Sequence, residues 1–150
     1  MTRRLALVSA LVALMVLLLA VTVPVASAAT KTLHFTSPVK EQTIQRVDIG
    51  KKGPSLGDLF FVNAPLHKQG GGIAGSLYVA CTLVKVNPQK NHCVGTLSLS
   101  GGQITFQGVI NPPVFTVAVT GGTRAYQTAR GQFTTRITKN TTFFTLHLIL

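Results

Sequence analysis

Apolar and polar side chains alternate with a period of two residues over most of this sequence. Near the C-terminus Phe144, Leu146 and Leu148 alternate with Thr145 and His147. Successive side chains of a β-strand point to opposite faces, whereas an α-helix requires a period of 3.6 residues. Gly or Pro also interrupts nearly every stretch that is long enough for a helix. The chain is therefore predicted to be all β.

About eight strands are expected, separated by turns rich in glycine. The clearest turns are Gly70–Gly72, Gly101-Gly102 and Gly121-Gly122. Short strands at this spacing are typical of a sandwich or a barrel. In the segment after Gly122, Gly131 is expected to break the strand. The candidate strand segments are residues 32–36, 42–49, 59–63, 73–86, 104–110, 115–119, 124–137 and 144–150.

Residues 1–28 predict a secretory signal peptide. Arg3-Arg4 precedes a long uncharged run, and Ala26-Ser27-Ala28 provides the small side chains that a signal peptidase requires. The run is also long enough for an uncleaved membrane anchor. The small residues favour cleavage near Ala28, which leaves one mature domain, 29–150. The expected location is secreted or in the cell envelope.

The balance of charges excludes several functions. The chain has 14 Lys and Arg but only 3 Asp and Glu, and its formal net charge is +11. Three acids, Glu41, Asp48 and Asp58, leave little for two-carboxylate catalysis or for oxygen-rich cation sites. The basic residues form no stripe with interleaved aromatic residues, so no nucleic-acid partner is expected. Attraction to an anionic envelope surface and a merely solubilising charge both stay open.

Two cysteines flank a cluster typical of a turn. Cys81 and Cys93 lie on either side of residues 87–91, which predicts a hairpin with one cysteine on each arm. In an oxidising compartment a disulfide is expected, and a reactive free thiol is the alternative. No second Cys or His pair has the spacing of metal ligands, so no metal site is expected.

One motif early in the mature chain and one late in it resemble a known family. The early motif is Ser55-Leu56-Gly57-Asp58-Leu59, and the late motif runs from Val117 through Gly121-Gly122 to Gly131-Gln132. Together they resemble the allene oxide cyclase barrel-like family and, more distantly, the dirigent proteins, over residues 33–150. The resemblance implies an eight-stranded antiparallel β-barrel, often a homotrimer, with an elongated apolar cavity and no cofactor.

The family also suggests functions. Plant cyclases close a fatty-acid-derived epoxide inside the barrel, and dirigent proteins steer reactive phenolic species. The resemblance therefore implies an exported barrel that binds or sterically steers a small apolar ligand in its lumen. The alternatives are a cofactor-free isomerase or cyclase, a dirigent-type stereocontrol protein, and a basic protein that interacts with the cell envelope.

The residues of the family are only partly present. Asn63 corresponds to a polar cavity residue after the early motif, and Cys81 corresponds to the cavity cysteine of the plant cyclases. The acid that those cyclases carry on their first strand is missing from residues 33–37. A disulfide to Cys93 would also remove the thiol. Cyclase activity itself is therefore not expected.

Other candidate residues have both a functional and a structural interpretation. Tyr78, Tyr126 and Arg130 are candidates for the ligand cavity together with Asn63, but tyrosines commonly pack with the hydroxyl at a surface. Arg130 could equally be exposed or paired with an acid. Asp58 is either a cavity group or a turn aspartate bonded to its own backbone.

Overall fold

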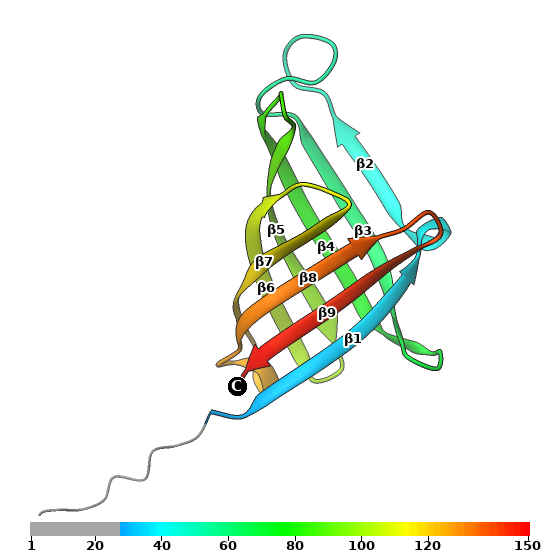
Figure 1. The fold of residues 1–150 in the computed structure, drawn as a ribbon, viewed down its shortest axis with the longest axis vertical. Helices are drawn as coiled ribbons and strands as arrows, with labels where there is room; N and C mark the ends of the chain where they lie inside the picture. Colours follow the sequence, from blue (N-terminus) through cyan, green and yellow to red (C-terminus); the bar gives the residue numbers. More distant parts are fainter. Residues whose placement is uncertain (1–27) are drawn as a thin grey trace, which may run out of the picture.

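The computed structural model describes residues 28–150, which form nine strands and two short 3-10 turns (Figure 1). The all-β prediction is confirmed, and the predicted signal peptide lies outside the described residues, apart from Ala28. No helix in the described part is long and apolar enough to cross a membrane. The elements are β1 (Thr30–Pro38), η1 (Val39–Glu41), β2 (Thr43–Val47), β3 (Leu59–Lys68), β4 (Ile73–Lys85), β5 (Lys90–Leu99), β6 (Gly102–Ile110), β7 (Val114–Gly122), η2 (Arg124–Tyr126), β8 (Arg130–Ile137) and β9 (Thr141–Ile149).

The strands form one antiparallel sheet that closes on itself. Their order is β1-β9-β8-β7-β6-β5-β4-β3-β2, and the first strand also contacts β3 through the pairs Phe35–Lys68 and Thr36–His67. β1 pairs with β9 along its whole length, whereas β2 pairs with the first half of β3. The two segments meet at η1 and act as one interrupted wall strand (Figure 1). The predicted eight-stranded barrel is confirmed, with its first strand split in two.

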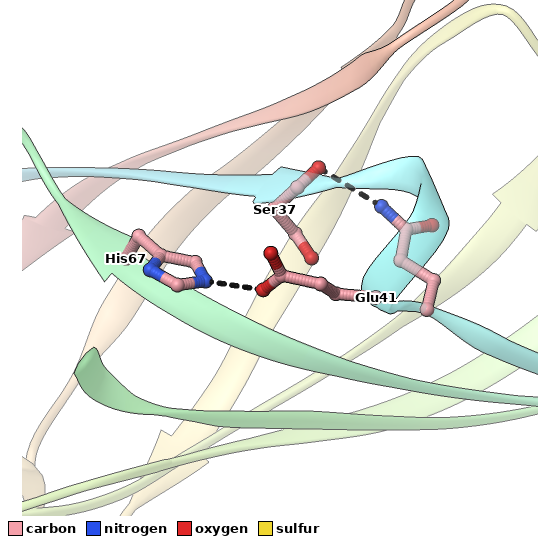
Figure 2. Close-up of polar contacts among 4 residues, drawn as sticks. Ser37, Glu41 and His67 are labelled. Atoms are coloured by element: carbon pink, nitrogen blue, oxygen red, sulfur yellow. Dashed lines mark hydrogen bonds and ion pairs between the residues drawn. The ribbon is translucent and has the colours of Figure 1, made fainter. Parts of the chain in front are cut away.

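Side-chain contacts fix the chain at this split (Figure 2). The Gln42 side chain donates from Nε2 to the backbone carbonyl of Ser37 at 3.1 Å and to Thr142 Oγ1 at 2.9 Å. On the other side, His67 Nε2 lies 2.8 Å from Glu41 Oε2. Together these contacts tie η1 and its flanks to both β9 and β3. The alternation in the sequence carries no sign of them, because the partners are far apart along the chain.

Inward-facing side chains form a buried core in one half of the barrel. Phe133 lies at the centre of the core, with ring centroids 4.5 Å from Phe106 and 5.8 Å from Phe144. Full burial of such side chains stabilises the fold by about 2 kcal/mol each. At the closed end of the barrel the buried ring of Tyr126, from η2, contacts the β5–β6 turn. The core side chains with no exposed surface are Leu66, Leu97, Ile104 and Leu146.

The start of β8 and the two faces of β9 have features that the alternation of side chains does not predict. Gly131 does not break a strand: β8 starts at Arg130 and passes through Gly131, whose φ is +128°. The preceding residues form η2, which begins at Arg124, a residue other than glycine with a positive φ of +55°. At the C-terminus β9 lies between β1 and β8, with Phe144, Leu146 and Leu148 buried in the core and the outward Phe143 and Ile149 exposed. Its outward Phe143 packs under the guanidinium of Arg136, 4.5 Å from the ring centroid.

Candidate functional site

The open half of the barrel lumen contains a cavity of about 490 Å³. This volume lies within the range of about 300–1,000 Å³ that is usual for small-molecule sites. The cavity wall is mainly apolar, because the alternation of the strands directs their apolar residues inward. Five aromatic rings contribute to the wall, from Phe60, Phe106, Phe115, Phe133 and Phe144.

Small residues on the strands make room for these rings. A Cβ atom at Gly95 would lie 2.2 Å from the ring of Phe106, which is its direct partner across β5 and β6. Ala64, which is buried on β3, likewise leaves lumen space that a larger side chain would fill. The positions of small residues therefore determine where the lumen stays open.

A polar rim surrounds the mouth of the cavity. Arg46 on β2, Gln89 in the β4–β5 turn and Asn111 in the β6–β7 turn belong to its lining. The guanidinium of Arg46 lies 6.0 Å from the ring centroid of Phe60. Within residues 28–150 no carboxylate lies within salt-bridge distance of it. Arg46 is also the one ionisable side chain among the described lining residues, since both lining cysteines are oxidised.

The predicted disulfide is confirmed. Cys81 and Cys93 are direct partners across β4 and β5, and they form a disulfide that lines the cavity. Both residues are almost fully buried, at 2% and 1% exposed. The position that corresponds to the cavity cysteine of the plant cyclases therefore offers a disulfide sulfur rather than a thiol.

None of the four predicted cavity residues lines the lumen cavity. Asn63 and Tyr78 face outward, where they contribute to a shallow hollow on the outer wall, and Tyr78 is 51% exposed. The reason is register, because the inward residues of β3 are even-numbered, from Phe60 to Leu66. Tyr126 is buried at the opposite, closed end of the barrel. Arg130 is exposed at the start of β8.

Three polar residues that line the lumen were not predicted from the sequence: Asn91, Gln42 and Arg46. Asn91 is 4% exposed and lies on the inner face of β5, two residues before Cys93. Residues two apart on a strand share a face, so the inward direction of Cys93 could have placed Asn91 in the lumen. No comparable signal exists for Gln42 and Arg46, which reach the lumen only because η1 redirects the chain.

The early motif forms a turn beside the mouth. Gly57 has φ +96°, and Asp58 accepts hydrogen bonds from the backbone N–H groups of Ser55 at 2.8 Å and Ile49 at 2.9 Å. The Ser55 hydroxyl donates a third, at 3.0 Å. Of the two interpretations of Asp58, the structure shows the turn aspartate. The hydrogen bond from the Ser55 N–H, then that from Ile49, lowers the pKa of the Asp58 carboxyl below its ordinary value of 3.8.

Asp58→Asn is expected to change how stability depends on pH. A carboxyl whose pKa is lowered by folding stabilises the fold above its unfolded pKa and loses this effect as the pH falls through the folded value. The urea midpoint of the wild type should therefore exceed that of the variant most at pH 5–6, and the gap should shrink towards pH 2. A gap that stays constant over this range would contradict the assigned hydrogen bonds.

The described residues contain no group of three or more His, Cys, Asp and Glu side chains that could hold a metal ion. The lumen lining itself has no Asp, Glu, His or Lys. Its chemistry is therefore that of aromatic rings, aliphatic surface, amide and hydroxyl groups, one disulfide and one guanidinium. Such a site can bind and orient a molecule and exclude water from it.

Known proteins with the same fold are found among solved structures. No family model and no curated protein sequence matches the chain. A pyocyanin demethylase matches with a TM-score of 0.68 and 26% identity, over 80% of this chain and 99% of that one. The pterocarpan synthase dirigent protein GePTS1 matches with a TM-score of 0.65 and 17% identity, over 81% and 85%. This chain has the dirigent barrel fold.

A third match extends the range of chemistry found on this barrel. The Diels-Alderase AbmU from Streptomyces koyangensis has a TM-score of 0.66 and 12% identity, over 79% of this chain and 63% of that one. The dirigent-like part of the sequence resemblance is thereby supported at the level of the fold. A specific relationship to allene oxide cyclases stays a prediction.

Proposed function

We propose that the mature chain binds a small, mainly aromatic molecule in the barrel lumen and holds it in one orientation. The observation that carries this proposal is the cavity of about 490 Å³ in the barrel lumen, lined by five phenylalanine rings. The pyocyanin demethylase and the dirigent protein, both named for acting on or making small organic molecules, support a ligand of this size class.

The physical basis is burial and confinement. Apolar surface that leaves water contributes about 25 cal/mol per Å², and rings stack or tilt against other rings at distances like those within the core. A tube with few polar groups leaves a ligand few orientations, because each polar atom of the ligand must find a partner or stay at the mouth. Arg46 at the rim adds an attraction for an acceptor or anionic group that projects from the mouth.

Steric control of a reacting ligand is the second candidate. A proton-transfer enzyme of the cyclase type needs a free Cys81 thiol or an acid in the lumen, but Cys81 is bonded to Cys93 and the described lining has no acid. Confinement in a reactive conformer needs neither group. The ring-lined lumen therefore favours steric steering over acid–base chemistry.

We also propose that the protein acts outside the cytoplasm. The support is the predicted signal peptide at residues 1–28 together with the disulfide, since disulfides persist mainly in oxidising compartments. Attachment to an anionic envelope surface and assembly into a trimer stay predictions from charge and resemblance.

Filling the lumen should abolish most binding. In Ala64→Phe, a ring on the inner face of β3 would occupy the cavity, and the Kd for N-phenyl-1-naphthylamine is expected to rise at least about tenfold. The fluorescence of this probe increases in apolar surroundings, so titration of the oxidised mature protein measures the Kd directly. Thermal unfolding establishes that the variant is folded.

The matched control is Ala118→Phe, which adds the same ring on the exposed outer face of β7. Its Kd should equal that of the wild type. Val62→Phe, also in the lumen, provides a second blocking variant if Ala64→Phe does not fold. Binding that survives both lumen variants, or that Ala118→Phe weakens equally, would overturn the lumen as the ligand site.

A further inference from the structure

One polar group in the apolar lumen has no partner. The side-chain carbonyl oxygen of Asn91 is fully buried and accepts no hydrogen bond. The residue as a whole is 4% exposed. Its neighbours across the strands are Leu83 and Ile110, which offer no side-chain donor. A buried polar atom without a partner destabilises a fold, so an unpartnered amide in a ligand cavity needs an explanation.

Asn91 lies at the junction of two cavities. It lines both the lumen cavity and an adjacent hollow of about 220 Å³ beneath the loop between β2 and β3. Arg46, Phe60 and Gln89 also line both spaces, so Asn91 lies where the two meet. Within the lumen Asn91 is flanked by apolar groups, with Cys81–Cys93 on one side and Ile110 on the other. A ligand in the cavity would meet a single buried amide at this point.

We propose that Asn91 determines the specificity of the lumen by hydrogen bonding to a hydroxyl group of the ligand. This inference rests on the proposed function. A hydroxyl fits the amide in either orientation about the terminal bond, because it can donate to the carbonyl oxygen and accept from the NH₂ group. The ligand is thus an aromatic molecule with a hydroxyl group that reaches the wall of β5, rather than a pure hydrocarbon.

The contrast with other polar lining residues supports this assignment. Gln42 uses its amide within the protein, on Ser37 and Thr142. Asn111 lies exposed at the mouth, where water can satisfy its amide. Asn91 alone among the lining asparagine and glutamine residues is buried without a partner in the described structure. Discrimination against a ligand without a donor is strongest at such a site, because the protein group is then left unpaired.

The test compares two probes of nearly the same size. 2-Naphthol has a hydroxyl where 2-methylnaphthalene has a methyl group. For each protein the measured quantity is the ratio of the Kd of 2-methylnaphthalene to that of 2-naphthol. Asn91→Leu keeps the number and branching of the side-chain heavy atoms and removes the amide. Asn63→Leu, on the exposed outer face of β3, is the matched control outside the lumen.

Asn91→Leu should lower the ratio about tenfold relative to the wild type, while Asn63→Leu leaves it unchanged. The Kd of 2-methylnaphthalene should change little in either variant, and thermal stability should not fall, since Asn91→Leu removes an unpaired buried group. An unchanged ratio, or an equal loss of both probes, would overturn the role of Asn91 while lumen binding stands. If neither probe binds the wild type, the proposed function fails together with this inference.

Discussion

Replacing Cys81 and Cys93 together with alanine is expected to lower the free energy of unfolding by at least about 3 kcal/mol. The disulfide closes a loop with a sequence separation of 12 residues, and the cross-link restricts the unfolded chain by about this amount in the chain-entropy model. For a domain of this size the melting temperature should fall by roughly 10 °C. Urea denaturation of the oxidised wild type and of the double variant measures the difference.

Reduced wild-type protein separates the cross-link from side-chain volume. Reduction breaks the bond but leaves both sulfur atoms in the wall, whereas alanine also removes buried atoms. The reduced protein should therefore lie between the oxidised wild type and the double variant. Equal stability of the oxidised and reduced forms would show that the disulfide contributes nothing to the fold.

The second large effect is expected for Gly131→Ala, which should destabilise the fold by roughly 3–5 kcal/mol. Gly131 has φ +128°, a conformation that favours glycine, and a Cβ atom there would lie 2.0 Å from the backbone oxygen of His147. This oxygen belongs to the neighbouring β9, so relief of the clash requires the β8–β9 ladder to separate locally. Thermal or urea unfolding provides the measurement.

Gly57→Ala is the matched control. Gly57 also has a positive φ, +96°, but nothing lies within 4 Å of the position of a Cβ atom. The Gly57→Ala variant has the backbone strain without the clash, so its free energy of unfolding should fall by about 1 kcal/mol. If the two variants are equally destabilised, the close approach of β9 to Gly131 does not determine its identity.

The alternation of side chains predicts most of this fold, and the resemblance supplies its closure into a barrel. The segments 32–36 and 42–49 are predicted as separate strands, but neither source predicts that they share one position in the wall, along β3. The chain moves from β9 to β3 at η1 because Gln42 bonds to Thr142 and Glu41 contacts His67. Those partners come from distant segments, so local pattern could not place them. Arg46 reaches the lumen only as a consequence.

The candidate cavity residues predicted from the sequence were placed on the wrong face of their strands in two cases, Asn63 and Tyr78. A motif gives the position of a residue along a strand, but a shift of one residue moves a side chain to the other face. Tyr78 and Cys81 are three apart on β4, so they cannot both face the lumen, and the inward position belongs to Cys81. Parity relative to the cysteines would have excluded Tyr78 and selected Asn91.

The interruption between β1 and β2 also leaves one weakly paired place in the barrel wall, at β2. β2 pairs only with β3 and is exposed along its length, and β1 adds only two residue pairs to β3, whereas the other wall strands have longer ladders on both sides. Local unfolding follows the segments with the fewest buried contacts, so β2 can detach by breaking one short ladder while the rest of the wall stays intact. The strand that carries Ile44 and Arg46 over the cavity is thus the part least coupled to global stability. Entry and exit of the ligand that we propose would then require no opening of the aromatic core.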